Sequence, residues 1–201
     1  MIVIENYIEN LKSKFPEMGA MQPWEIIDNL EFLLSQQIKK LDDSYIIENN
    51  IAIHKSATIE QGVILKGTIL ISENCFIGAN AYLRGPVFLG QSVIIGPSSE
   101  IKQSIIFDQS VIAHFNYIGN SILGENTNFE AGSICANHYN ERFEKTIFIK
   151  HNNQIIDTKT EKFGSLVGDH TKIGANAVLS PGTILEKNSI VRRLELVEQI
   201  K

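Results

Sequence analysis

The chain has 201 residues, of which 43% are hydrophobic and 20% are charged, and its formal net charge is −5. This length is enough for one substantial core, and an acidic balance without a clustered basic excess excludes an extended nucleic-acid-binding surface. No stretch approaches the ~20 apolar residues of a membrane span, and the first residues lack a basic leader. We therefore expect one structural unit in the cytoplasm, with neither nucleic acid nor membrane as a partner.

The first segment, residues 1–48, carries apolar residues at helical spacing. They form two groups: Ile4, Ile8 and Leu11, then Ile26, Ile27, Leu30, Leu33, Leu34, Ile38 and Leu41. The stretch Phe15-Pro16-Glu17-Met18-Gly19 separates the groups, so the pattern predicts two helices. Because the end of a solenoid exposes strand edges and core side chains, we expect these helices to cap the repeat that follows. A separate binding module is the alternative.

From Ile53 onward, every sixth residue is aliphatic or small. These residues are Ile53, Ile59, Leu65, Ile71, Ile77, Leu83, Leu89, Ile95, Ile101, Phe107 and Ala113, and the register returns at Val167, Ile173, Leu179, Leu185 and Val191. A six-residue unit holds one short strand and one turn, and its repetition is typical of a solenoid. We therefore predict an all-β solenoid, a parallel β-helix over residues 49–191.

With three units per turn, residues eighteen apart lie on adjacent turns, roughly 4.8 Å from each other. The predicted inward columns are Ile53, Ile71, Leu89 and Phe107; Ile59, Ile77, Ile95 and Ala113; and Leu65, Leu83 and Ile101. The position two residues earlier is also small or aliphatic and should point inward. Cys75 and Cys135 fall on inward positions without metal-ligand spacing, so we expect buried free thiols.

The repeat is interrupted twice. After Ala113, apolar residues follow at Ile118 and Leu123, five positions apart, which predicts tightened corners. After Cys135 the next repeat residue is Val167, so residues 137–164 should leave the solenoid as an external loop. In it, residues 146–149 and 154–157 are expected to pair as a hairpin that could wall a pocket. Residues 192–201 are expected to form a short C-terminal helix, with Leu194 and Val197 turned inward.

Two cations, Arg84 and Lys102, lie eighteen residues apart and should stand side by side on the outside of adjacent turns. Like charges opposite each other are destabilising unless a carboxylate or a bound anion neutralises them. Glu100, two residues from Lys102, is the candidate carboxylate. The sequence leaves open whether this is a solvated pair or a phosphate or carboxylate site.

His114 follows Ala113 at the break in phase and should therefore point outward, with Tyr117 three residues later. A neutral imidazole can act as a general base toward an amine or a hydroxyl, although a lone histidine is more often structural. Asn128 and Asn137 lie near the same break, where asparagine also serves turns. The other histidines show no spacing for a three-histidine metal site, so we expect no metal.

These residues resemble the hexapeptide-repeat acyltransferases with a left-handed parallel β-helix, specifically the acetyltransferase half of bifunctional sugar-1-phosphate nucleotidyltransferases. The resemblance covers roughly residues 49–191. Its motifs are Arg84-Gly85-Pro86, Glu100-Ile101-Lys102, His114-Phe115-Asn116-Tyr117-Ile118-Gly119, and the run from Asn128 to Asn137. Gln22-Pro23-Trp24-Glu25 is also similar to the helical connector between the two halves in archaeal-type members.

The resemblance implies an acetyl-CoA-dependent N-acetyltransferase for an amino-sugar phosphate such as glucosamine 1-phosphate. It makes His114 the general base and gives the sugar phosphate to Arg84 and Lys102. Tyr117, Asn128 and Asn137 would orient the sugar and its amine, and Ala131 and Ala175 would contact acetyl-CoA. It also implies a homotrimer in which acetyl-CoA lies between neighbouring chains.

Two departures from the family pattern concern the substrate site. His138 stands where the family often has Tyr, and a family lysine has no ungapped match because Phe143 occupies its place; Lys145 is the nearest substitute. About fifty residues precede the repeat, too few for a nucleotidyltransferase domain. We therefore expect no nucleotidyl transfer by this chain alone, and a separate nucleotidyltransferase is a possible partner. The alternatives are acyl transfer to another amine or hydroxyl, and a non-catalytic solenoid that binds sugar phosphate or serves assembly.

Overall fold

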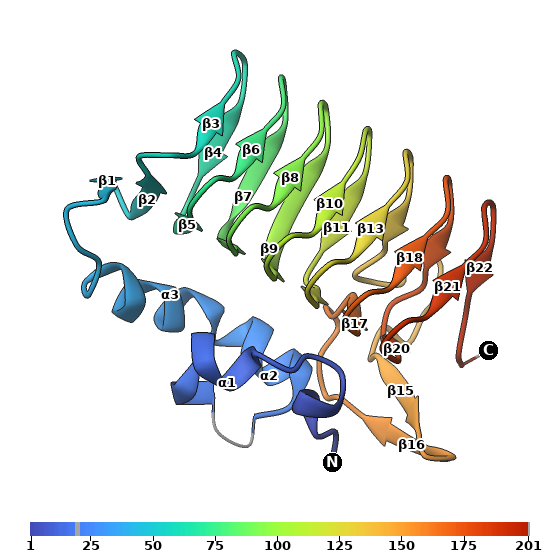
Figure 1. The fold of residues 1–201 in the computed structure, drawn as a ribbon. Helices are drawn as coiled ribbons and strands as arrows, with labels where there is room; N and C mark the ends of the chain where they lie inside the picture. Colours follow the sequence, from blue (N-terminus) through green and yellow to red (C-terminus); the bar gives the residue numbers. More distant parts are fainter. Residues whose placement is uncertain (19–20, 201) are drawn as a thin grey trace.

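The computed structural model describes residues 1–18 and 21–200 and shows a parallel β-helix with helices packed along one flank (Figure 1). Gly19, in the expected break between helices, and Lys201, in the expected C-terminal helix, lie outside the described residues. Within the described part, no helix is both long enough and apolar enough to cross a membrane.

The helical elements are the 3-10 turns η1 (Ile4–Asn6) and η2 (Pro16–Met18) and the α-helices α1 (Leu11–Lys14), α2 (Pro23–Asp28) and α3 (Leu30–Ile38). The strands are β1 (Tyr45–Glu48), β2 (Ile51–His54), β3 (Thr58–Ile59), β4 (Ile64–Lys66), β5 (Ile69–Ile71), β6 (Phe76–Ile77), β7 (Tyr82–Leu89), β8 (Ile94–Ile95), β9 (Glu100–Ile106), β10 (Val111–Ile112), β11 (Tyr117–Gly119), β12 (Ile122–Leu123), β13 (Asn128–Phe129), β14 (Ile134–Cys135), β15 (Phe148–His151), β16 (Gln154–Asp157), β17 (Ser165–Val167), β18 (Lys172–Ile173), β19 (Val178–Leu179), β20 (Thr183–Leu185), β21 (Ile190–Val191) and β22 (Leu196–Val197).

The coil has three faces. The seven-stranded sheet, in the order β21-β18-β13-β10-β8-β6-β3, forms one face. A thirteen-stranded sheet wraps around the other two, because β7 and β9 both run across a corner. We call these the first face, with β4, β11, β14, β19 and β22, and the second face, with β5, β12, β17 and β20. The prediction of a parallel β-helix is confirmed.

Most of the expected inward columns are present. Ile53 pairs with Ile71 and Ile71 with Leu89, and Leu65 pairs with Leu83 and Leu83 with Ile101. Cys75 and Cys135 are buried free thiols, as expected, and burial raises the pKa of each to about 12. Neither thiol is therefore a nucleophile at neutral pH.

The change of phase occurs earlier than the sequence predicted. Leu89 pairs with Ile106 and Ile95 with Ile112, so Phe107 and Ala113 are not inward residues. The loss of one residue lies between Lys102 and Ser104, and the two five-residue sides are 101–106 and 118–123. Phe107 turns outward instead and packs under the helices beside Phe88.

Some turns of the coil are seventeen residues long. There, the oxygens of hydroxyl and amide side chains accept hydrogen bonds from backbone N–H groups of the next turn of the coil. Ser99 Oγ accepts from Asn116 N at 3.2 Å, and Asn116 Oδ1 accepts from Ser133 N at 2.8 Å. At a second corner, Ser104 Oγ accepts from Ser121 N at 3.1 Å, and Ser121 Oγ accepts from Ser165 N at 3.0 Å where the chain returns from the external loop. These bonds satisfy buried donors at the points where the shorter turn leaves the strand ladder.

The N-terminal helices cover the second face along its length instead of capping the end of the coil, so the expected cap is wrong in position (Figure 1). The outward residues of that face form one buried column: Ala52, Leu70, Phe88, Ile105, Ile122, Leu166 and Ile184. Phe15 packs into this column with its ring centroid 4.9 Å from that of Phe88. The face is thus buried on both sides, as in a sheet covered by helices.

Strands, not helices, lie at both ends of the coil. Residues 45–54, whose first part was expected in the helical cap, form the antiparallel β1–β2 hairpin, which joins the coil through β5. Residues 192–200 contain β22 and turns, so the expected C-terminal helix is wrong. The Gln199 side chain pairs with the backbone of Ile184 at 2.9 and 2.7 Å and holds this tail against the coil.

A hairpin forms in the segment between β14 and β17, but its first strand is residues 148–151 and not the expected 146–149. β15 and β16 pair in antiparallel fashion around Asn152-Asn153, whose φ angles of 48° and 60° suit a tight hairpin turn. The loop leaves after β14 and returns at β17, which is the corner between the first and second faces. Its returning residue Phe163 is fully buried and packs edge-on against Trp24 of α2 at 6.1 Å.

Replacing Phe15 tests whether the helices are an integral part of the core. Because Phe15 is 1% exposed between Phe88 and Phe107, Phe15→Ala is expected to lower the free energy of unfolding by ~3–5 kcal/mol. The control is Phe32→Ala on α3, a phenylalanine that is 65% exposed, and it should change this value by less than ~0.5 kcal/mol. Denaturant unfolding gives both values, and equal midpoints for the two variants would contradict the expectation.

Candidate active site

The first face carries the predicted pair of cations. The strand register places Arg84 of β7 directly beside Lys102 of β9, with Gly119 of β11 on the next turn. Glu100 pairs with Arg84, at 3.7 Å from Nη1 to Oε1, and not with Lys102 as the sequence suggested. Two cations and one carboxylate therefore share this part of the face, and one positive charge is in excess.

A third cation reaches this cluster from the external loop. Burial lowers the pKa of Lys102, the positive charges of Arg84 and Lys162 lower it further, and Glu100 opposes them. Lys162 comes near because the residues after it are bonded to the adjacent turns: Phe163 N donates to Asn137 O at 3.0 Å, and Gly164 N to Asn120 O at 2.9 Å. We call Arg84, Lys102 and Lys162 the cation cluster.

Lys145, the substitute expected from the sequence, is exposed on the same loop, and its charge is not among those that shift the pKa of Lys102. Lys162 could not have been found by spacing, because it lies sixty residues beyond Lys102 and off the repeat.

Tyr117 and Asn137 complete this side of the site. Glu100 lies in register between Tyr82 and Tyr117. Burial raises the pKa of the Tyr117 hydroxyl and the Glu100 charge adds to this, whereas the Arg84 charge and the Asn137 side chain oppose it. Asn137 is buried, and its amide donates to Asn120 Oδ1 at 2.6 Å. His138 Nδ1 lies 3.1 Å from Asn137 Oδ1, so the histidine that departs from the family pattern is next to the Asn137 amide.

His114 stands at the corner between the first face and the seven-stranded sheet. It follows β10 of that sheet and precedes β11 of the first face, and its side chain is exposed. Its exposure agrees with the prediction, but the reason differs, since the inward neighbour is Ile112 and the half-buried Ala113 belongs to the turn.

Ala131 and Ala175 occupy the same corner on the next two turns. The registers of Ile112 with Phe129 and of Phe129 with Ile173 place them in line with His114. Gly132 N donates to His114 O at 2.9 Å, and Asn176 N to Ala131 O at 3.0 Å. The corner thus aligns an imidazole with the two alanines expected at acetyl-CoA.

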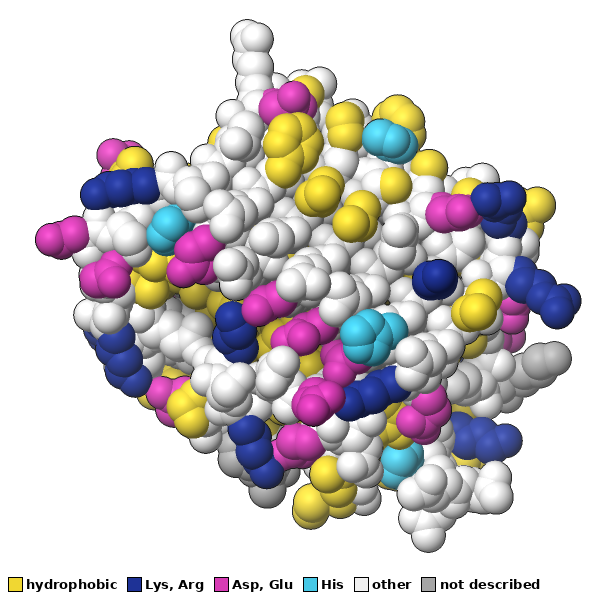
Figure 2. All heavy atoms as spheres, viewed as in Figure 1, with side chains coloured by type: hydrophobic (Ala, Val, Ile, Leu, Met, Phe, Trp, Pro, Cys, Tyr) yellow, Lys and Arg dark blue, Asp and Glu magenta, His cyan; other side chains and the backbone are white. Residues whose placement is uncertain are grey.

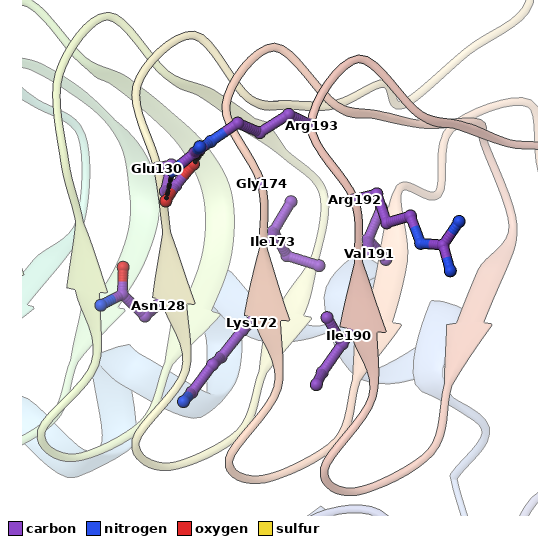
Figure 3. Close-up of a pocket in the computed structure, with 9 residues that line it drawn as sticks. All are labelled: Asn128, Glu130, Lys172, Ile173, Gly174, Ile190, Val191, Arg192 and Arg193. Carbon is purple, nitrogen blue, oxygen red and sulfur yellow. Dashed lines mark hydrogen bonds and ion pairs between the residues drawn. The ribbon is translucent and has the colours of Figure 1, made fainter.

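A hollow of about 640 Å³ opens beside this corner, on the seven-stranded sheet (Figure 3). Asn128, Glu130, Lys172 and Arg193 contribute to its lining. Arg193 reaches across the intervening turn and binds Glu130 through two bonds of 2.8 Å, while Glu130 also accepts the Ala175 N–H at 2.8 Å. These bonds lower the pKa of Glu130 to about 2.

Asn128, like Lys145, is an expected substrate residue that a single chain does not bring to the cation cluster. It is exposed on β13 of the seven-stranded sheet, in register with Val111 and Lys172, whereas Tyr117 lies on the first face. Figure 2 shows a row of hydrophobic side chains over that sheet. The outward column of the sheet includes Phe76, Ile94 and Val111.

Within the described residues, no group of three or more His, Cys, Asp or Glu could hold a metal ion.

Comparisons with known proteins agree with the repeat and with the fold. Residues 66–148 match the family described as GMPPB C-terminal domain, and residues 166–192 match the hexapeptide repeat of succinyl-transferase. A crystal structure of a hexapeptide transferase family protein from Anaplasma phagocytophilum shares the fold, with a TM-score of 0.51 and 15% identity over 75% of this chain and 81% of that one. The chain is thus similar to the hexapeptide-repeat acyltransferases.

Curated relatives of this acyltransferase are longer than it is. A Sulfurisphaera tokodaii protein named bifunctional sugar-1-phosphate nucleotidylyltransferase/acetyltransferase is 34% identical over 173 residues, which are 82% of this chain and 42% of that protein. The bifunctional protein GlmU of Methanococcus vannielii is 35% identical over 91 residues, 44% of this chain and 20% of that protein. The chain thus spans less than half of the relatives it matches.

Lysine variants test the composition of the cation cluster without any assay of activity. Because the Lys162 charge lowers the pKa of Lys102, Lys162→Ala is expected to raise that pKa, whereas Lys145→Ala should leave it unchanged. Glu100→Gln should lower it, since a favourable negative charge is removed. Titration of ¹³Cε-labelled lysines by NMR, with the Lys102 signal assigned through Lys102→Arg, measures all three. An identical shift in the two alanine variants would exclude Lys162 from the cluster.

Proposed function

We propose that this acyltransferase transfers the acetyl group of acetyl-CoA to the amine of an amino-sugar phosphate, such as glucosamine 1-phosphate. The observation that carries the proposal is the cation cluster on the face beside the His114 corner. Its three positive charges against the single carboxylate of Glu100 suit a dianionic phosphate monoester. The sugar-1-phosphate and acetyltransferase activities in the name of the Sulfurisphaera tokodaii relative support the same substrate class.

In the proposed reaction, Arg84, Lys102 and Lys162 hold the phosphate, and Tyr117 and Asn137 orient the sugar. The His114 imidazole accepts a proton as the amine nitrogen attacks the thioester carbon, so that a C–N bond forms and the carbonyl oxygen becomes an oxyanion; the C–S bond breaks when this intermediate collapses. The imidazolium then returns that proton to the departing thiolate. Backbone N–H groups near Ala131, on the turn beside His114, would stabilise the oxyanion between the two steps.

We propose a homotrimer in which each site is completed by a neighbouring chain. Asn128 and Tyr117 lie on different faces of one chain, on either side of the His114 corner. A neighbour that presents its seven-stranded sheet to the first face would bring its own Asn128 to the cation cluster. The row of hydrophobic side chains on that sheet gives such a contact an apolar surface.

Replacement of His114 tests the general base. His114→Ala is expected to lower kcat with glucosamine 1-phosphate by at least ~10²-fold, measured as thiol release from acetyl-CoA. His54→Ala, at the far N-terminal end of the coil, is the matched control and should keep the wild-type rate. An unchanged rate in His114→Ala would exclude the base assignment, and a panel of amino sugars and their phosphates would identify a different acceptor if glucosamine 1-phosphate does not react.

Mixed oligomers test the shared site. Light scattering is expected to give roughly three times the chain mass of 22.5 kDa. Co-refolding of two inactive variants, His114→Ala and Asn128→Ala, should restore activity, because some sites in the mixed trimer combine an intact His114 with a neighbour's intact Asn128. A monomer in solution, or a mixture as inactive as its components, would contradict the proposal.

A further inference from the structure

Gln103 is the residue at which the coil changes from eighteen to seventeen residues per turn. Arg84 pairs with Lys102 and Val87 with Ser104, so Gln103 alone lies opposite the two residues Gly85 and Pro86. Its φ angle is +44°, in the left-handed region that residues with a Cβ seldom occupy. An uneven match of this kind is a β-bulge, and a bulge re-aims the side chains beside it. Those side chains are the two paired cations.

The side chain of Gln103 binds the N-terminal helices, which we call the helical unit (η1, α1, η2, α2 and α3). Its Nε2 donates to the backbone oxygen of Ile27 at 3.1 Å, near the end of α2. The last carbonyls of a helix lack the usual partner four residues on; the Asn29 N–H at the end of α2 is directed to Ile27 O, and the Gln103 amide adds a second donor to this oxygen of a fully buried residue. The bond therefore joins a left-handed turn in the coil to a rigid point in the core of the helical unit.

The strand on the other side of the cation pair is fixed to the same helices. Gly85 packs closely against Thr68, the residue that precedes β5. A Cβ added to Gly85 would lie 2.5 Å from Thr68 O. The Thr68 hydroxyl in turn bonds the Glu31 carboxylate of α3. Lys102 O accepts both Ser104 Oγ, at 2.7 Å, and Asn120 N, at 2.9 Å. Both strands that carry the cation pair are thus connected to the helical unit: β9 through Gln103, and β7 through Thr68.

We propose that Gln103 is a positioning residue for the acceptor site: its bond to α2 holds the left-handed turn that aims Lys102 toward Arg84 and the acceptor's phosphate. The inference rests on the proposed function for the identity of that anion. It makes the N-terminal helices part of the phosphate site, although none of their residues belongs to the cation cluster.

Two variants separate the hydrogen bond from the backbone conformation. Gln103→Asn keeps an amide and a residue that tolerates positive φ, but it is one methylene too short to reach Ile27. Gln103→Glu keeps the length and loses the donor. The matched control is Gln109→Asn, at an exposed turn residue with a φ of +59°. Circular dichroism and thermal melting establish that each variant is folded.

Both Gln103 variants are expected to raise the KM for glucosamine 1-phosphate roughly tenfold, with kcat and the KM for acetyl-CoA within about twofold of wild type. Gln109→Asn should leave all three unchanged. A fall in kcat without a change in the acceptor KM, or equal effects at Gln103 and Gln109, would overturn the proposal.

The NMR titration of Lys102 provides a readout that does not depend on the reaction. Loss of positioning lets the ammonium move into solvent and away from Arg84, so its lowered pKa should rise toward the ordinary lysine value in Gln103→Asn and Gln103→Glu. A Lys102 titration identical to wild type in both variants would overturn the positioning role. If wild-type protein does not acetylate glucosamine 1-phosphate, the proposed function fails, and this titration still decides whether Gln103 positions Lys102.

Discussion

Backbone hydrogen bonding between successive turns is the constraint on which the molecule depends. Each strand of the coil has its partners one turn before and one turn after, so the number of residues per turn decides which side chains meet. Eighteen residues bring Arg84 beside Lys102, and seventeen bring Glu100 beside Tyr117. One residue lost beside Lys102 shortens the spacing to seventeen in the turn that follows, and the second short side at 118–123 keeps it there, whereas the last turns pair at eighteen again. The serine and asparagine side chains at the corners accept the donors that the shorter turn displaces.

The scaffold could be predicted from the sequence because inward aliphatic residues recur every six positions over most of the coil. The point where the phase changes could not, because Ile105, Ile106 and Phe107 are all apolar and the pattern does not say which of them faces inward. The position of the helices had a visible signal that was missed. Ile69-Leu70-Ile71 and Val87-Phe88-Leu89 are uninterrupted apolar runs, which is typical of strands buried on both faces.

The candidate site could be predicted in part. The adjacency of Arg84 and Lys102 follows from the repeat alone, and the exposure of His114 agrees with its expected place at a turn. Lys162 could not be predicted, because the path of an inserted loop depends on tertiary contacts such as that between Phe163 and Trp24. That Asn128 and Tyr117 lie on different faces could not be predicted either, because the spacing of two residues along the chain does not say which face of a three-sided coil each one occupies.

The helices that cover the second face also restrict how copies of the chain can associate. A three-sided prism with every face free could contact neighbours on all sides and grow into a lateral lattice. Here one side is filled by the chain's own N-terminal segment, which leaves two unlike faces that meet at the His114 corner. Identical copies joined through two unlike faces form either a closed ring or an endless fibre, according to the rotation between them. For copies that associate through these two faces, the angle at that corner therefore decides between a ring and a fibre.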